Sequence, residues 1–402
     1  MGSRRTARMP SPGKPLSSGK SSERAFVFVP KLVCPGDILL TRIPLHLFDP
    51  STFTSTAIRA ASRTPFSHAA LCIEPGLMIE AVGTGVCRFA LAPTGVRSRS
   101  NVKLLRLNLD VVDGPWRAQS AADRGHQYLS RGYSLSGAIG ARIAAFRKKG
   151  RGDLFCSELV AQAYEEARCP LLPGKTPGEI APGDLLKSDI LRDVTDLVLR
   201  AVRIDSPLTY YLDDGSHFER TAHWEVRTKI KILQSEPVQR ELAALGVIAQ
   251  SFYELEKVLR NGESPGLDRA VYDELVRHDF CGEYMRRTLA SIGIADAGEI
   301  ADPVFGARFE PSEEQIARLD TDSLNFLKQD AESSIISFQN DVISRKADIQ
   351  IWARHRGSGN SRTFDYLAAM QQPLLDISEQ LLVLSQKEND CLAAEQHKRA
   401  AQ

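Results

Sequence analysis

The sequence predicts an α+β domain followed by an all-helical region. Short apolar runs bounded by turn residues dominate residues 25–110, a pattern typical of strands. After about residue 220, apolar residues recur at helical spacing, which indicates amphipathic helices. At 402 residues the chain is long enough for two such units. We therefore expect a disordered basic tail over 1–24, an α+β domain over 25–215 and a helical bundle over 216–402.

Within the first unit, strands and helices fall largely in separate runs along the chain. The expected strands are 25–29, 36–40, 67–73, 77–82, 86–91 and 102–109. The expected helices are 51–63, 115–131, 135–148 and 153–168. Pro75-Gly76 separates the third strand from the fourth and predicts a hairpin there.

Three apolar stripes at helical spacing mark the second unit, and each predicts an amphipathic helix that buries its stripe against a neighbour. The stripes are Leu242, Leu245, Ala249, Phe252 and Leu259; Leu324, Leu327, Ala331, Ile335, Phe338 and Val342; and Leu374, Ile377, Leu381 and Leu384. Glycine-rich breaks over 261–266 and 356–360 separate them.

The charge is nearly balanced, with 51 basic against 50 acidic residues, so no general attraction to nucleic acid is expected. The basic tail has no apolar segment of a secretory signal, and nowhere do about 18 apolar residues follow one another. Residues 1–6 fit a short N-myristoylation pattern, but that pattern is common by chance, so we expect an ordinary start and no membrane contact.

The seven cysteines are odd in number and widely spread, without a C-x-x-C pair. This pattern predicts neither a disulfide framework nor a zinc knuckle, and reduced thiols in the cytoplasm fit best. His217 and His223 lack ligand-like companions nearby in the sequence, so we expect no metal and no cofactor. The basic cluster over 147–151 reads as a solvated loop, or as a means of attracting an anionic substrate.

Cys156 and His68 are the residues that carry chemistry. Cys156 lies in the first turn of the predicted helix 153–168, with Asp153 as its expected N-cap. The free N–H groups of a helix N-terminus favour a thiolate and can donate to an oxyanion. His68 lies in the predicted strand 67–73, where a rigidly held imidazole can exchange a proton. Taken singly, each residue is more often structural, because cysteine is among the most buried residue types. Together they indicate a cysteine hydrolase.

Glu80 is the expected partner of His68. It lies on the other arm of the predicted hairpin, and the two share a face only if the turn contains an odd number of residues. A three-residue turn sets Glu80 opposite Ala70, with His68 as its diagonal neighbour on the same face. A carboxylate among apolar neighbours needs a partner, because an unpaired buried charge is costly.

The chain resembles the permuted NlpC/P60-type papain-like cysteine hydrolases, and especially their YiiX-like branch, over about residues 33–190. The motifs that carry the resemblance are Pro35-Gly36-Asp37-Ile38, Ser67-His68-Ala69-Ala70-Leu71, the run 79–86, Gly132-Tyr133, Phe155-Cys156-Ser157-Glu158-Leu159-Val160 and the run 180–188. In that branch the histidine strand precedes the cysteine helix. The resemblance implies Cys156 as nucleophile, His68 as general base and then acid, and Glu80 as the residue that orients His68.

The expected activity is cleavage of an amide, peptide or (thio)ester bond through an acyl-enzyme on Cys156, with the Cys156 N–H and one further donor holding the oxyanion. We expect a peptide, N-acyl or lipid-like small substrate inside the cell. Two alternatives stay open. One is an acyltransferase of the lecithin:retinol acyltransferase type, which carries a different cysteine motif. The other is a non-catalytic scaffold whose helical region binds a protein partner or a second copy.

Overall fold

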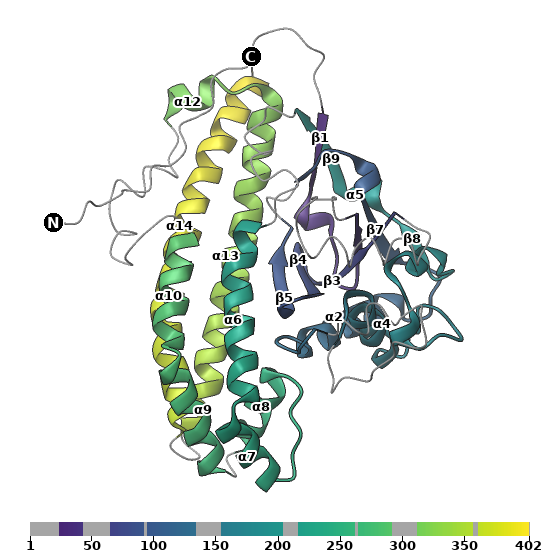
Figure 1. Cartoon of the computed structure of the whole chain (residues 1–402). Coiled ribbons are helices and arrows are strands. Elements are labelled where there is room, and N and C mark those ends of the chain that lie inside the picture. Colours follow the sequence, from purple (N-terminus) through teal and green to yellow (C-terminus); the bar gives the residue numbers. More distant parts are fainter. Residues whose placement is uncertain are drawn as a thin grey trace, which may run out of the picture.

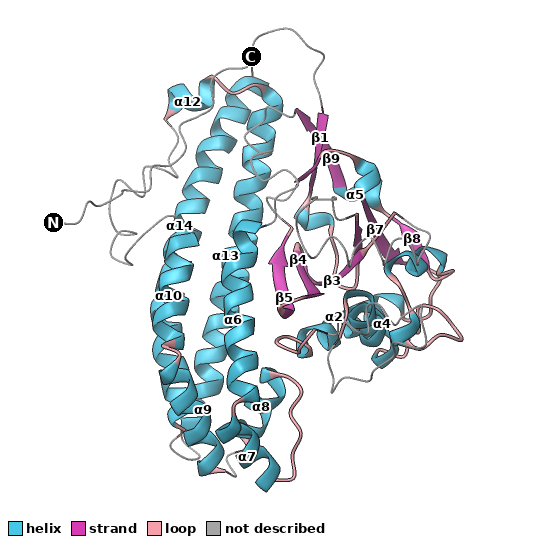
Figure 2. Ribbon diagram, viewed as in Figure 1, coloured by secondary structure: helices cyan, strands magenta, loops and turns pink. Residues whose placement is uncertain are grey.

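The computed structural model describes residues 24–42, 65–91, 95–133, 154–203, 216–261, 264–291, 312–356 and 361–401. All of its strands lie before residue 204, and every described element from Ser216 onward is a helix (Figures 1 and 2). The predicted α+β class, with antiparallel sheets and a C-terminal helical region, is confirmed. Several predictions fall outside the described residues, namely the tail 1–23, the helices 51–63 and 135–148, Asp153 and the basic cluster 147–151. Arg24, the last residue of the predicted tail, begins β1.

Six strands form the larger sheet, in the order β5-β4-β3-β2-β7-β8, and every neighbouring pair is antiparallel. Their bounds are β2 (Ile38–Thr41), β3 (His68–Glu74), β4 (Leu77–Val82), β5 (Gly85–Ala90), β7 (Val102–Leu107) and β8 (Leu191–Asp193). A smaller antiparallel sheet has the order β6-β1-β9, with β1 (Arg24–Phe28), β6 (Gly95–Val96) and β9 (Leu199–Arg203).

The two faces of the larger sheet are buried by different partners, which explains its nearly continuous apolar strands. Along β3, Ala69 and Leu71 belong to the core that contains the helices α2 (Gly114–Gln127) and α4 (Cys156–Glu166). Ala70 and Cys72 belong to a second core, shared with the small sheet. The remaining elements of this half are α5 (Thr195–Val198) and the 3-10 turns η1 (Pro30–Leu32), η2 (Arg99–Asn101), η4 (Pro177–Glu179) and η5 (Pro182–Lys187).

The β3–β4 hairpin has the register that the sequence predicts, but its turn is different. Ala70 pairs with Glu80, as expected. The turn has two residues, Pro75 and Gly76, rather than three, and a bulge between Cys72 and Glu74 supplies the extra residue. A bulge residue in a strand shifts the pairing of the two strands by one residue, as an extra turn residue would. Glu80 therefore still lies on the same face of the sheet as His68.

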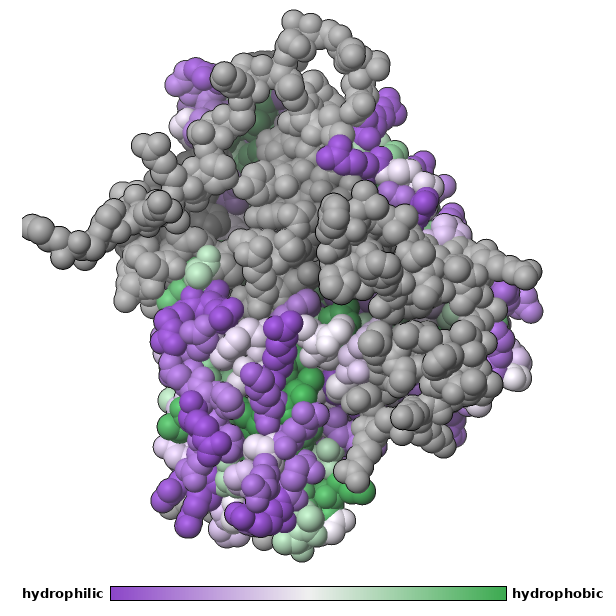
Figure 3. All heavy atoms as spheres, in the orientation of Figure 1, coloured by the Kyte–Doolittle hydropathy of each residue, from purple (hydrophilic) through white to green (hydrophobic). Residues whose placement is uncertain are grey.

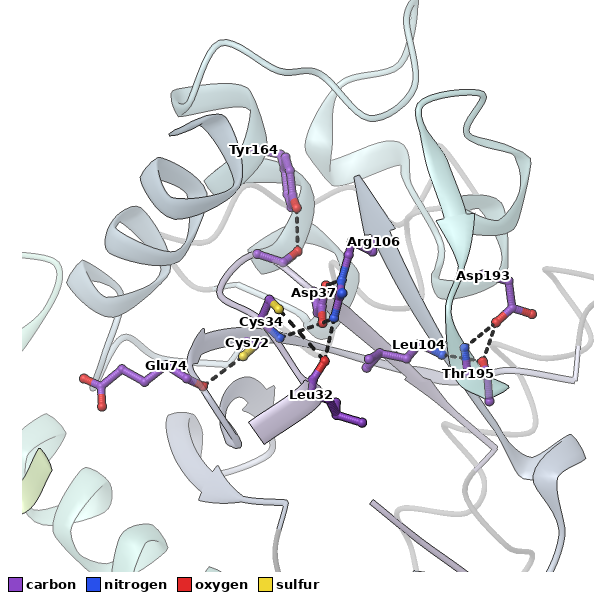
Figure 4. Close-up of polar contacts among 11 residues, drawn as sticks. Leu32, Cys34, Asp37, Cys72, Glu74, Leu104, Arg106, Tyr164, Asp193 and Thr195 are labelled. Carbon is purple, nitrogen blue, oxygen red and sulfur yellow. Dashed lines mark hydrogen bonds and ion pairs between the residues drawn. The ribbon is translucent and has the colours of Figure 1, made fainter. Parts of the chain in front are cut away.

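A buried ion pair fixes the start of β2. The carboxylate of Asp37 is 1% exposed and accepts two hydrogen bonds from Arg106, both at 2.7 Å (Figure 4). It also accepts the Cys34 N–H at 2.8 Å, and Arg106 donates to the Leu32 carbonyl at 2.7 Å. A bidentate guanidinium–carboxylate contact is stronger and more directional than a hydrogen bond between neutral groups, so these bonds tie the loop before β2 to β7.

The described part of the helical region contains three helices of 19 residues or more, and shorter helices pack against them. The helices are α6 (Ser216–Gln234), α7 (Glu236–Ala244), α8 (Phe252–Arg260), α9 (Pro265–Arg277), α10 (Phe280–Ser291), α12 (Glu313–Ala317), α13 (Thr321–Arg356) and α14 (Arg362–Ala400). Leu324 in α13 and Leu374 in α14 are buried, so the second and third stripes are confirmed as helices. Hydrophilic side chains cover most of the coloured surface of this region in Figure 3. Among the described helices, none combines the length and apolar character needed to cross a membrane.

The first stripe is wrong as a single helix. It divides between α7 and α8, and Leu245, a member of the stripe, lies between them and is 38% exposed. Gly246 has φ +66°, a left-handed conformation that glycine adopts without strain and that ends α7. The Ser251 side chain then accepts the Glu254 N–H and starts α8.

The helix α6 packs directly on β5 at Gly85. A Cβ atom at this glycine would lie 2.7 Å from the Arg131 carbonyl oxygen, 2.7 Å from Ile230 Cδ1 and 2.9 Å from Val226 Cγ1. Its φ is +123°, a conformation that other residues rarely adopt. The absence of a side chain at Gly85 therefore sets how closely α6 approaches the sheet.

We expect Gly85→Ala to lower the free energy of unfolding by roughly 2–4 kcal/mol, because it adds backbone strain and a clash with α6. Gly174→Ala is the matched control: its φ is +83°, but no atom lies within 4 Å of the new Cβ. Urea unfolding of both variants measures the difference. Equal losses in the two would show that the contact with α6 contributes nothing.

Candidate functional site

His68 and Glu80 form a close pair on the neighbouring strands β3 and β4 of the large sheet. His68 Nε2 lies 2.5 Å from Glu80 Oε2, and the two side chains are only 12% and 9% exposed. His68 is the first residue of β3 and Glu80 is central in β4, so two hydrogen-bonded strands fix both backbones. The contact matches the diagonal arrangement that the register predicts.

Cys156 is the first residue of α4 and is 3% exposed. Asp153 was the expected N-cap, and this expectation is wrong, because the N-cap position is occupied by Phe155. Phe155 has no polar side chain to cap the helix. Instead Glu158, at the third helical position, accepts the Phe155 N–H at 3.5 Å. The start of α4 is also held by the Leu154 N–H, which donates to the Gly132 carbonyl at 3.1 Å.

His68 interacts with Cys156 as well as with Glu80. Burial alone would lower the pKa of His68. The charges of Cys156 and Glu80, and hydrogen bonds to both side chains, outweigh burial and raise this pKa well above its ordinary value. The structure therefore brings together all three predicted site residues, from β3, β4 and the N-terminus of α4.

A titration of the His68 ring by NMR tests this electrostatic arrangement. We expect His68 in the wild-type chain to lose its proton well above pH 6.5, since two negative partners stabilise the imidazolium. Both Glu80→Gln and Cys156→Ala are expected to lower its pKa, and Cys156→Ala more strongly, because the Cys156 charge is the larger of the two raising influences. A wild-type pKa at or below 6.5 contradicts the arrangement; the spectrum of His68→Gln identifies the resonance.

Tyr133 is a neighbour of the site for which the sequence predicts no role. It forms an isolated parallel bridge with Leu154, directly before the cysteine helix. Burial, and then the charge of Cys156, raise the pKa of its phenol, so Tyr133 keeps its O–H proton at neutral pH. Its place in the Gly132-Tyr133 motif was the only sequence signal that pointed to it.

Two further residues lie on the far side of Glu80. Cys87, on β5, pairs directly with Glu80, and His223 comes from α6. Burial, and secondarily Arg227, lower the pKa of His223, while the Glu80 charge opposes this shift. The position of Cys87 follows from the hairpin between β4 and β5. No local signal places His223 there, because it lies 143 residues after Glu80 in the chain.

Comparison of the chain with protein-family models, with curated proteins and with solved structures finds no match. The function must therefore be argued from the chemistry of these side chains.

Proposed function

We propose that the chain is a cysteine hydrolase that cleaves an amide, peptide or (thio)ester bond. The observation that carries the proposal is the position of His68, whose Nε2 lies 2.5 Å from Glu80 Oε2 and whose pKa the neighbouring Cys156 raises. A nucleophile, a base and a residue that orients the base are the three parts that acyl transfer requires. An isolated structural cysteine has no need of the other two.

The proposed topology is that of a permuted NlpC/P60-type papain-like domain. An antiparallel sheet with a cysteine at the N-terminus of a packed helix supports it, as does the histidine strand that precedes this helix in the chain. The sequence resemblance over residues 33–190 supports the same assignment, and the helical region after residue 215 lies outside it.

The chemistry proceeds in two halves. The Cys156 thiolate attacks the carbonyl carbon of the substrate, and the electron pair of the C=O bond moves to oxygen. When the tetrahedral intermediate collapses, the bond to the leaving group breaks and the His68 imidazolium donates its proton to that group. Water then attacks the thioester while His68 takes one of its protons, and the returning imidazolium and thiolate complete the cycle. Glu80 holds the ring orientation throughout.

The oxyanion needs at least two donors. The N–H groups of the first turn of α4 supply one side, because they have no partner within the helix. Tyr133 is our candidate for the second donor, since its phenol stays protonated and lies within the influence of the Cys156 charge.

We expect Tyr133→Phe to lower kcat by roughly 10–1,000-fold, the usual effect of removing one oxyanion donor. The alkylation rate of Cys156 should change little, because the variant leaves the Cys156–His68 pair intact. Steady-state kinetics and alkylation of the same preparation provide the two values. If the alkylation rate fell by the same factor as kcat, Tyr133 would act on the reactivity of the Cys156 thiol and not on the oxyanion.

The activity is tested with a panel of activated esters, thioesters and aminoacyl or N-acyl anilides, each with and without an added amine acceptor. We expect hydrolysis of at least one class, and a reduction by about four orders of magnitude or more in Cys156→Ser and His68→Gln. Cys169→Ser is the matched control, because Cys169 is also buried and lies just after the other end of α4. Acyl transfer to the amine in place of hydrolysis indicates the transferase, and no turnover of any class indicates the non-catalytic scaffold.

A further inference from the structure

Glu80, Cys87 and His223 form a compact group of three metal-ligating side chains. One donor atom from each lies within 4.8 Å of the other two. The carboxylate and the thiol come from adjacent, directly paired positions of β4 and β5, so a rigid hairpin holds them. The imidazole comes from α6, whose Val226 and Ile230 pack on Gly85 of the same strand β5. The position of His223 is therefore set by the close approach of α6.

The donor set suits a zinc-class divalent ion. A sulfur, an imidazole nitrogen and a carboxylate oxygen are the three ligand types that zinc takes, at about 2.0–2.3 Å. A tetrahedron with such bonds has donors about 3.3–3.8 Å apart. The group therefore has to contract by roughly an ångström, which side-chain rotation can supply. Three protein ligands leave the fourth position to water.

One atom of the group lacks the partner that burial normally demands. His223 Nε2 is buried and has no hydrogen-bond partner among the described residues. Buried polar atoms are nearly always satisfied, so this nitrogen indicates a bound species that completes it. Glu80 can serve His68 and a metal together, because a carboxylate has two oxygens and about four lone-pair positions.

The geometry points to a divalent zinc-class metal site formed by Glu80, Cys87 and His223, which suppresses the thiol site when it is filled. The suppression, though not the binding, rests on the proposed function. A metal ion bound to Glu80 offsets part of the carboxylate charge that stabilises the His68 imidazolium. The interaction between His68 and Cys156 is then stabilised less. On binding, Cys87 releases its thiol proton to the buffer. The helical region thus gains a role, because it supplies one ligand of a regulatory site.

Cobalt(II) and zinc titrations of the metal-free full chain test the site. We expect one cobalt equivalent with a near-ultraviolet sulfur-to-metal absorption band, and displacement of cobalt by zinc. The band should vanish in Cys87→Ser. His223→Gln should weaken binding by more than about 100-fold, since loss of an outer partner alone costs 10–100-fold. Thermal unfolding of each variant verifies that it is folded.

Cys156→Ala distinguishes metal binding at this site from metal binding by Cys156 and His68. We expect it to keep the cobalt band and the affinity. No band in the wild type, or a band that survives Cys87→Ser and disappears in Cys156→Ala, overturns the site. Zinc should also slow the alkylation of Cys156 by about tenfold, reversibly with chelator and not in His223→Gln. Binding without this slowing would overturn the regulation alone, and failure of the proposed hydrolase would leave the cobalt result unaffected.

Discussion

We expect His68→Gln to slow the alkylation of Cys156 by at least about 30-fold at pH 7. An ordinary free cysteine is only about 3% thiolate at this pH, whereas the proposed mechanism requires that His68 has taken the proton of Cys156. The difference grows to about 300-fold at pH 6, because each unit of pH lowers the thiolate fraction of a free cysteine tenfold. Iodoacetamide labelling followed by peptide mass spectrometry gives the rate at each cysteine.

The same sample contains its own controls. Cys34 and Cys391 are exposed, and their rates should be identical in the wild type and in His68→Gln. At pH 6 the buried Cys156 of the wild type should react faster than both, although burial alone would make it the slower. A Cys156 that reacts no faster than Cys391 at pH 6 would remove the chemical basis of the proposed mechanism.

The largest effect on stability is expected from Asp37→Ala, which should lower the free energy of unfolding by about 3–5 kcal/mol. The change removes both bonds to Arg106 and the acceptor of the Cys34 N–H, and leaves a guanidinium that is only 24% exposed without its carboxylate. The hydrogen bond to Asp37 is the largest influence that raises the pKa of Arg106. A guanidinium stays protonated in proteins even without such a partner, so the variant leaves a charged group unpaired.

Glu379→Ala is the control for Asp37→Ala. Glu379 pairs with Lys346 at 2.8 Å, but both side chains are about half exposed. Pairs of this kind contribute roughly 0–1 kcal/mol, because water screens their attraction. Urea unfolding of both variants provides the comparison. A loss below about 1 kcal/mol for Asp37→Ala would mean that the buried pair does not fix the start of β2.

The sequence predicts local features of this chain well and distant contacts poorly. The apolar spacing of α4 predicts a helix with Cys156 in its first turn, although the expected N-cap lay two residues too early. The position of Glu80 opposite Ala70 follows from strand alternation. The turn length was wrong even though the register was right, because a bulge and a longer turn shift the pairing equally. The first stripe was wrong because apolar spacing continues across Gly246, whose backbone conformation ends the helix.

The parts of the site that could not be predicted come from tertiary packing. His223 meets Glu80 because α6 packs on Gly85, a contact between segments far apart in the chain. Neither histidine spacing nor charge pattern near residue 223 encodes that approach. The position of Cys87 is partly predictable, because alternation in the β4–β5 hairpin places it opposite Glu80. Its proximity to His223 is not, because that contact forms only when the helices pack on the sheet.

In the proposed reaction Cys156 becomes a nucleophile through its contact with His68. Trapping the covalent intermediate tests this role. The full chain is mixed with an activated acetyl ester, quenched in acid within the first turnover and digested for peptide mass spectrometry. We expect one acetyl group on the Cys156 peptide of the wild type, and almost none in Cys156→Ser or His68→Gln. Acetyl groups that distribute over exposed cysteines such as Cys391, with Cys156 unmodified, would contradict it.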